Sequence, residues 1–216
     1  MLTGSRLVTI ARFLRRVEQP CCGALVGGKC VVIDSGAQMA LHEIVLPETK
    51  PETEWVRGRA LQKVSPQRDH ALLQLQFAMS LRLWAKGRGE VGTEWRFRVA
   101  PPFAVRRPLV PDVAYIANDR LRPLSDEELQ IPPLAPDIAV EILSPDDRRP
   151  DVDDKIHTYL QAGSLLVIVV DSKRRFIELH DPRATHYVDE TSAIEHAALP
   201  GFSYPVRELF DVLKRR

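Results

Sequence analysis

The chain has 216 residues, of which 44% are hydrophobic and 27% are charged, and its formal net charge at pH 7 is +1. These values are typical of a globular domain with a sizeable core, and the near-neutral charge excludes a protein that coats nucleic acid or a membrane surface by charge alone. No run of about 18 apolar residues occurs, so we expect no membrane-spanning helix. Local DNA contacts would depend on short basic runs at 106–107, 148–149 and 173–175.

The three cysteines, Cys21, Cys22 and Cys30, all lie near the start of the chain. A secreted domain of this size would more often carry an even number spread along the chain, so we expect a reducing, cytoplasmic location. No histidine follows at a familiar zinc spacing, which argues against a zinc site. The segment GALVGGKC at 23–30 resembles a phosphate-binding loop, but it lacks the hydroxyl residue and the following helix, so we reject that interpretation.

The first 38 residues differ from the rest of the chain in their pattern of residue types. SRLVTIARFLRRVE predicts a short amphipathic helix, and the glycines and cysteines after it have no clear pairing partner. Met39 begins a stretch that is typical of a compact domain. We therefore expect residues 1–38 to be a loosely attached N-terminal extension, with an upstream misassignment of the start codon as one explanation, and residues 39–216 to form the domain.

The first strong element in the chain is a helix over 68–86, which glycines at 87 and 89 end. Its apolar side chains cover nearly the whole circumference. We expect such a helix to be buried on more than one side, against a sheet and a second surface. A homodimer interface is the second surface that we predict.

Strands and shorter helices follow in an order that indicates a mixed α/β domain. LLVIVV is a continuous apolar run, which is typical of a strand covered on both faces. Ser125 and Glu128 stand at capping-box spacing and begin a short helix. The predicted strands are 93–99, 111–117, 137–143, 165–170 and 175–180, with THYV as a pairing segment, and the remaining helices are 151–162 and the tail VRELFDVL.

Two of these strands carry acids at interior positions. Because side chains alternate across a strand, Asp112 and Ala114 share one face of the first strand, and Ala139 and Glu141 share one face of the second. Each acid therefore has a small neighbour that leaves room around the carboxylate. If the two strands pair, Asp112 and Glu141 converge on one cavity, where two carboxylates repel unless a proton or a cation lies between them.

Hard oxygen ligands of this kind are what Mg²⁺ prefers. The following helix places Asp151, Lys155 and Tyr159 along one flank, and Lys155 could reach Glu141 over the strand ends. An ammonium there would stabilise the charge that develops on a phosphate under attack.

Structural interpretations of the same residues stay open at this point. Asp112 could be a turn residue after a proline, and Asp151 with Lys155 could form a surface ion pair. Glu141 could lie on the solvent-exposed face of an edge strand.

The segments VPDVAYI, APDIAVEILSPDD, DVDDKIHTYLQAGS and LVIVVDSKRRFIELH resemble the Uma-type putative restriction endonuclease family of the PD-(D/E)xK nuclease superfamily, over about residues 40–213. The resemblance implies a restriction-endonuclease-like mixed β-sheet flanked by helices, with DNA as partner and Mg²⁺ or Mn²⁺ as cofactor. His70, in SPQRDHALL, matches a family histidine, for which we expect a capping or core role.

The resemblance also implies roles for individual residues. Asp112 and Glu141 are the implied metal-binding acids, and Glu54, in ETEWVRGRAL, would complete the site. The superfamily's usual lysine stands two residues after the second acid, where this chain has Leu143. Lys155 is then implied as a lysine relocated to the following helix.

Three functions follow from these residues. The first is a Mg²⁺-dependent DNA endonuclease with Asp112, Glu141 and Lys155 as catalytic residues. The second is a nuclease-fold module that binds nucleic acid or protein with weak or no cleavage, which the absent strand lysine favours. The third is a metal-dependent hydrolase of a small phosphate ester.

Overall fold

A computed structural model describes residues 43–214. The predicted amphipathic helix, the three cysteines, the glycine-rich segment at 23–30 and the whole predicted extension 1–38 lie outside the described residues, so those interpretations stay predictions.

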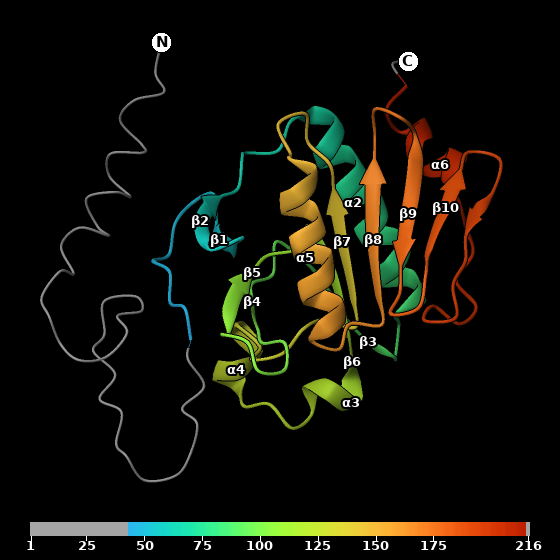
Figure 1. Cartoon of the computed structure of the whole chain (residues 1–216). Helices are drawn as coiled ribbons and strands as arrows, with labels where there is room; N and C mark the ends of the chain where they lie inside the picture. Colours follow the sequence, from blue (N-terminus) through green and yellow to red (C-terminus); the bar gives the residue numbers. More distant parts are fainter. Residues whose placement is uncertain (1–42, 215–216) are drawn as a thin grey trace, which may run out of the picture.

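A six-stranded sheet forms the centre of the fold, in the order β10-β9-β8-β7-β6-β3 (Figure 1). All neighbouring strands run antiparallel except β7 and β8, which are parallel and are joined by helix α5 (Arg149–Gln161). This arrangement confirms the predicted mixed α/β class. The strands of the sheet are β3 (Gly89–Thr93), β6 (Val113–Ala117), β7 (Ile138–Ile142), β8 (Leu166–Asp171), β9 (Phe176–His180) and β10 (Thr185–Asp189).

Helices cover both faces of this sheet. On one face α2 (Arg68–Trp84) and α6 (Val206–Asp211) pack on one apolar cluster, and on the other α5 packs on a second cluster together with two small hairpins (Figure 1). These hairpins are β1 (Thr53–Val56) with β2 (Arg59–Gln62), and β4 (Phe97–Val99) with β5 (Arg107–Leu109). The remaining elements are α3 (Asn118–Leu121), α4 (Asp126–Gln130), β11 (Ala193–Ile194) and β12 (Tyr204–Pro205).

The two central strands are buried at every position, as the apolar runs predict for strands covered on both faces. Side chains of β7 alternate between the two clusters: Ile138 and Val140 join the α2 side, and Ala139 joins the α5 side. Glu141 lies on the α5 side by the same alternation. The capping box of Ser125 and Glu128 is also present at the start of α4.

Helix α2 is buried on one side only. Leu73, Phe77 and Leu81 pack against the sheet, whereas Leu75, Met79 and Leu83 are 59%, 55% and 78% exposed. The sheet covers one side of this helix. The second surface that we predict is a homodimer interface, which a single chain does not test, so burial on a second side stays a prediction. No helix within 43–214 has the length and apolarity to cross a bilayer.

The predicted strand 93–99 is two strands. The chain turns at Glu94, whose φ is +51°, and Trp95 then folds back onto Gly92 and Phe97. The β1–β2 hairpin has no counterpart among the predicted elements. Its turn residues Arg57 and Gly58 both have positive φ, as a two-residue hairpin of this type requires.

An ion-pair cluster ties the start of α5 to β9. Arg149 donates two hydrogen bonds to the buried Glu178, of 2.5 and 2.9 Å, and His180 Nε2 lies 2.7 Å from the same carboxylate. Burial alone would raise the pKa of Glu178, but the hydrogen bonds from Arg149 and His180 outweigh it and hold the pKa below its ordinary value. Glu178 therefore stabilises the fold in its charged form.

We expect Glu178→Gln to lower the free energy of unfolding at pH 7 by about 1–3 kcal/mol, because Arg149 loses a charged partner. A carboxyl whose pKa is lowered by folding contributes stability above its unfolded pKa of about 4.5 and loses it as the pH falls further. The difference between wild type and variant should therefore shrink below about pH 4.5. Urea denaturation at pH 7 and pH 4 measures it, with the exposed Glu127→Gln as control; a difference independent of pH would contradict this account.

Candidate functional site

The ends of β6 and β7 bring two acids opposite each other. The strands run antiparallel with Ala114 paired to Ala139, and the same register two residues further on places Asp112 directly across from Glu141. Both side chains are buried, Asp112 at 2% and Glu141 at 7% exposure. The alanine pair beside them is fully buried in the apolar cluster on the α5 side of the sheet. The convergence of Asp112 and Glu141 follows from the alternation of side chains along the two strands.

Asp112 has a partner at each carboxylate oxygen. Its Oδ2 accepts a hydrogen bond of 2.6 Å from the backbone N–H of Ile142 and lies 3.2 Å from His70 Nε2, and its Oδ1 lies 2.6 Å from Lys63 Nζ. Burial would raise the pKa of Asp112, but Lys63 and His70 outweigh it and hold the pKa well below its usual range. Asp112 is therefore ionised at neutral pH.

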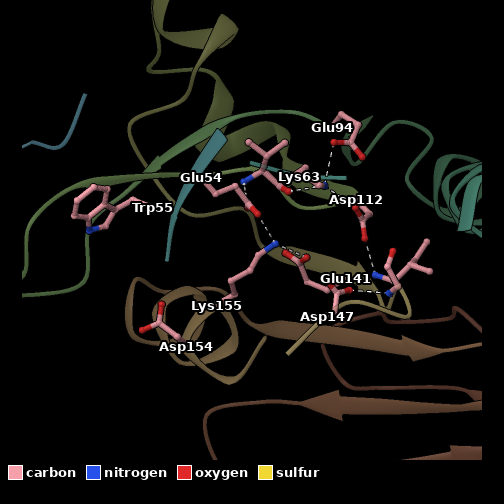
Figure 2. A network of polar contacts seen from close by, with 12 residues as sticks. Glu54, Trp55, Lys63, Glu94, Asp112, Glu141, Asp147, Asp154 and Lys155 are labelled. Atoms are coloured by element: carbon pink, nitrogen blue, oxygen red, sulfur yellow. Dashed lines mark hydrogen bonds and ion pairs between the residues drawn. The ribbon is translucent and has the colours of Figure 1, made fainter. Parts of the chain in front are cut away.

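Lys155 joins Glu141 to a third acid, Glu54 of β1 (Figure 2). Its Nζ donates to Glu141 Oε2 at 2.5 Å and to Glu54 Oε2 at 3.0 Å, and Glu54 Oε1 accepts from the backbone N–H of Val110 at 2.7 Å. The other oxygen of Glu141, Oε1, and the hydroxyl of Tyr159 are buried without a hydrogen-bond partner. Glu141 therefore keeps one oxygen available to bind something else.

The charges in this cluster shift the pKa values in opposing ways. Burial would lower the pKa of Lys155, but Glu141 and Glu54 outweigh it and raise the pKa, so the ammonium stays charged. Burial, with the charges of Asp112 and Glu54, raises the pKa of Glu141 to about 8 despite the opposing effect of Lys155. A carboxyl with a raised pKa favours a proton or an additional cation beside it.

A cleft of about 640 Å³ opens over the cluster. Its walls come from the β1–β2 hairpin, the start of α2, the end of β7 and the start of α5. Glu54, Asp112 and Glu141 line it together with cationic side chains, among them Lys50 and Arg148, and further acids, among them Glu52, Asp146 and Asp147, line it as well. An anionic substrate in this cleft would therefore depend on a bound cation to offset the acids.

The residues fit a divalent cation. Three carboxylates are the hard oxygen ligands that Mg²⁺ and Mn²⁺ prefer, and Glu141 Oε1 is a buried oxygen without a partner. Within residues 43–214, no three acidic, imidazole or thiol groups converge closely enough to hold an ion as they stand. Ammonium groups stand between the carboxylates instead, Lys155 between Glu54 and Glu141 and Lys63 beside Asp112.

The structure brings together all four residues singled out from the sequence, Glu54, Asp112, Glu141 and Lys155. Two of the structural alternatives do not hold, because β7 lies between β6 and β8 and is no edge strand, and Lys155 does not pair with Asp151. Asp112 does lie at a bend just before β6, and it is buried there. Asp151 accepts instead from Arg59 at 2.5 Å.

Two site residues differ from the sequence expectation. Lys63, just after β2, was not singled out, because the hairpin that positions it has no apolar alternation to predict it. His70 does not cap α2, whose N-cap Gln67 has no side-chain cap bond. Its side chain is only 10% exposed, and it contacts Asp112. Of the basic runs, Arg107 pairs with Asp154 and Arg149 with Glu178 inside the fold.

The fold and the cluster define a class of protein. The structure is similar to the crystal structure of a "putative nuclease belonging to DUF820" from Anabaena variabilis, with a TM-score of 0.70 and 24% sequence identity over 78% of this chain and 95% of that one. This likeness shows the nuclease fold. The family model described as "Uma2: Putative restriction endonuclease" matches residues 40–207, so the chain belongs to this family. No curated protein matches the chain.

We expect Lys155→Met to lower the free energy of unfolding by about 3–5 kcal/mol, because it leaves the buried charge of Glu54 without a cation, while Glu141, whose pKa is raised, takes up a proton. Adding Glu54→Gln to that variant should restore part of the loss, since the unpaired buried charge disappears. Urea denaturation in the presence of a chelator measures both. Lys173→Met, an exposed lysine in the β8–β9 turn, is the control, and a Lys155 variant as stable as this control would refute the pairing.

Proposed function

We propose that the chain is an endonuclease that hydrolyses the phosphodiester bonds of DNA with Mg²⁺ or Mn²⁺ as its cofactor. One observation carries the proposal: three carboxylates from separate elements, Glu54, Asp112 and Glu141, meet beside the ammonium of Lys155 at the floor of an open cleft. Membership of a restriction endonuclease family supports the same chemistry.

The acids and the lysine of the site would have different roles in hydrolysis. Asp112, Glu141 and Glu54 would hold the divalent ion, which when bound lowers the pKa of a water and offsets charge on the phosphate. Glu141 Oε1, which has no partner, is the oxygen of this residue that would be left for the ion. Lys155, held against Glu141, stabilises the added negative charge of the pentavalent phosphate.

The sides of the cleft are suited to the DNA backbone. Arg148 is exposed at the start of α5. Arg59 projects from the β1–β2 hairpin with a side chain 46% exposed, and it pairs with Asp151 at 2.5 Å. Neither is in the interior of the fold, and both line the cleft. Side chains of this kind contact phosphates without reading the sequence, so they position the DNA and leave its target sequence undefined.

A second candidate function is a nuclease-fold module that binds nucleic acid or protein and cleaves weakly or not at all. Two observations favour it. Leu143 occupies the strand position of the usual lysine, and Lys155 Nζ donates to two carboxylates inside the site. Cleavage and binding must therefore be measured separately.

We expect Glu141→Gln to reduce the nicking of supercoiled plasmid DNA in Mg²⁺ or Mn²⁺ by about a hundredfold or more, since it removes a ligand of the ion. Gel electrophoresis of plasmid digests measures the rate. Asp119→Asn, an exposed acid of α3, should cut at the wild-type rate. If the wild type nicks no faster than Glu141→Gln, the chain is not a nuclease, and salt-dependent DNA binding in both proteins would support the binding module.

We expect Arg148→Ala to weaken DNA binding equally for unrelated sequences. Each phosphate contact releases counterions, so the slope of log affinity against log salt concentration should fall by about 1. Fluorescence anisotropy of a labelled duplex at several salt concentrations, without divalent ions, gives the slope. Arg174→Ala, an exposed arginine in the β8–β9 turn away from the cleft, is the matched control; equal slopes for the two variants would place the DNA elsewhere.

A further inference from the structure

Lys63 is a second buried cation of the site. It follows β2 directly, its side chain is 14% exposed, and it approaches the cluster from the side opposite Lys155 (Figure 2). Its Nζ lies 2.6 Å from Asp112 Oδ1, 3.0 Å from Glu94 Oε2 and 3.0 Å from the carbonyl oxygen of Val110. The three N–H donors of the ammonium thus meet three oxygen atoms, two of them from carboxylates.

This is the environment of a bound cation. Burial by itself would lower the pKa of Lys63, but Asp112 foremost, followed by Glu54 and Glu141, outweighs it and raises the pKa. The ammonium therefore carries its charge at neutral pH, with its oxygen ligands arranged around it.

The contacts of Asp112 make Lys63 a competitor for a divalent ion. Asp112 Oδ2 already accepts from the backbone N–H of Ile142 and contacts His70. Oδ1 is the oxygen left for a metal, and Lys63 Nζ holds it at 2.6 Å. An ammonium and a divalent cation at the same oxygen repel each other strongly in a buried site.

We propose that Lys63 is a built-in cation that occupies the Asp112 side of the site in the metal-free protein and must leave Asp112 Oδ1 when a divalent ion binds. This inference rests on the proposed function, because it assumes that Asp112 is a ligand of the ion. It adds Lys63 as a residue that sets the affinity of the site for the divalent ion.

The two lysines differ in how they could move. Lys155 is 9% exposed and bridges two acids that are themselves buried, whereas Lys63 is also paired with Glu94, whose side chain is 39% exposed at the edge of the cleft. Gln74 of α2 fixes Glu94 through a hydrogen bond of 2.9 Å to its Oε1. Lys63 can therefore release Asp112 and keep its pairing with Glu94, so its displacement leaves no buried charge without a partner.

Titration of the full chain with Mn²⁺ alone, followed by calorimetry without DNA, tests the proposal. Lys63→Met and Lys63→Gln remove the competing charge, so we expect each to bind Mn²⁺ roughly tenfold more tightly than the wild type, or more. Lys173→Met changes a distant exposed lysine and should stay within about twofold of the wild type. An unchanged or weaker Mn²⁺ affinity in the two Lys63 variants overturns the proposal.

Two outcomes separate this inference from the proposed function. If the wild type binds Mn²⁺ and nicks DNA but the Lys63 variants bind no more tightly, the inference fails and the endonuclease stands. If neither the wild type nor any Lys63 variant binds Mn²⁺, no cation site exists and both fail.

A measurement on the wild type guards against variants that fail to fold. Addition of Mg²⁺ should shift the NMR signal of the Lys63 ε-methylene, assigned by its loss in Lys63→Arg, while the signal of exposed Lys173 stays in place. A Lys63 signal that does not move at saturating Mg²⁺ overturns the proposal without any substitution in the protein measured.

Discussion

Burial of three carboxylates at one end of the central sheet is the constraint on which the rest of the molecule depends. Acids buried as deeply as Glu54, Asp112 and Glu141 are unstable without compensating positive charge. The chain supplies that charge as two ammonium groups from different elements, Lys63 after β2 and Lys155 on α5. The contacts that hold the hairpin, the sheet and the helix together are therefore the same contacts that form the candidate active site.

The packing around the acids reflects the same constraint. The hydroxyl of the buried Tyr159 on α5 has no hydrogen-bond partner, and neither has Glu141 Oε1. Unpaired polar atoms destabilise a fold, so both are costly in a core that serves stability alone.

The sequence predicted those parts of the site that depend on local periodicity. Asp112 and Glu141 are placed by the alternation of a strand, and Lys155 by the repeat of a helix that follows the strand directly. Lys63 escaped prediction because its position depends on a tight hairpin turn at Arg57, which carries no periodic signal. The strand predicted over 93–99 failed for a related reason, since its turn at Glu94 is set by the fold of Trp95 and not by a glycine or proline. For helix α2, the apolar circumference predicts buried faces, but it does not say which surface covers each of them.

The Lys155–Glu54 ion pair joins residues 101 positions apart in the chain. During translation the β1–β2 hairpin leaves the ribosome long before α5. Glu54 is therefore synthesised well before Lys155, the residue with which it pairs. Only when most of the polypeptide has emerged can the charge cluster close. Any nuclease activity that depends on this cluster can therefore arise only after α5 has been synthesised, and fragments that stop short of α5 would lack it.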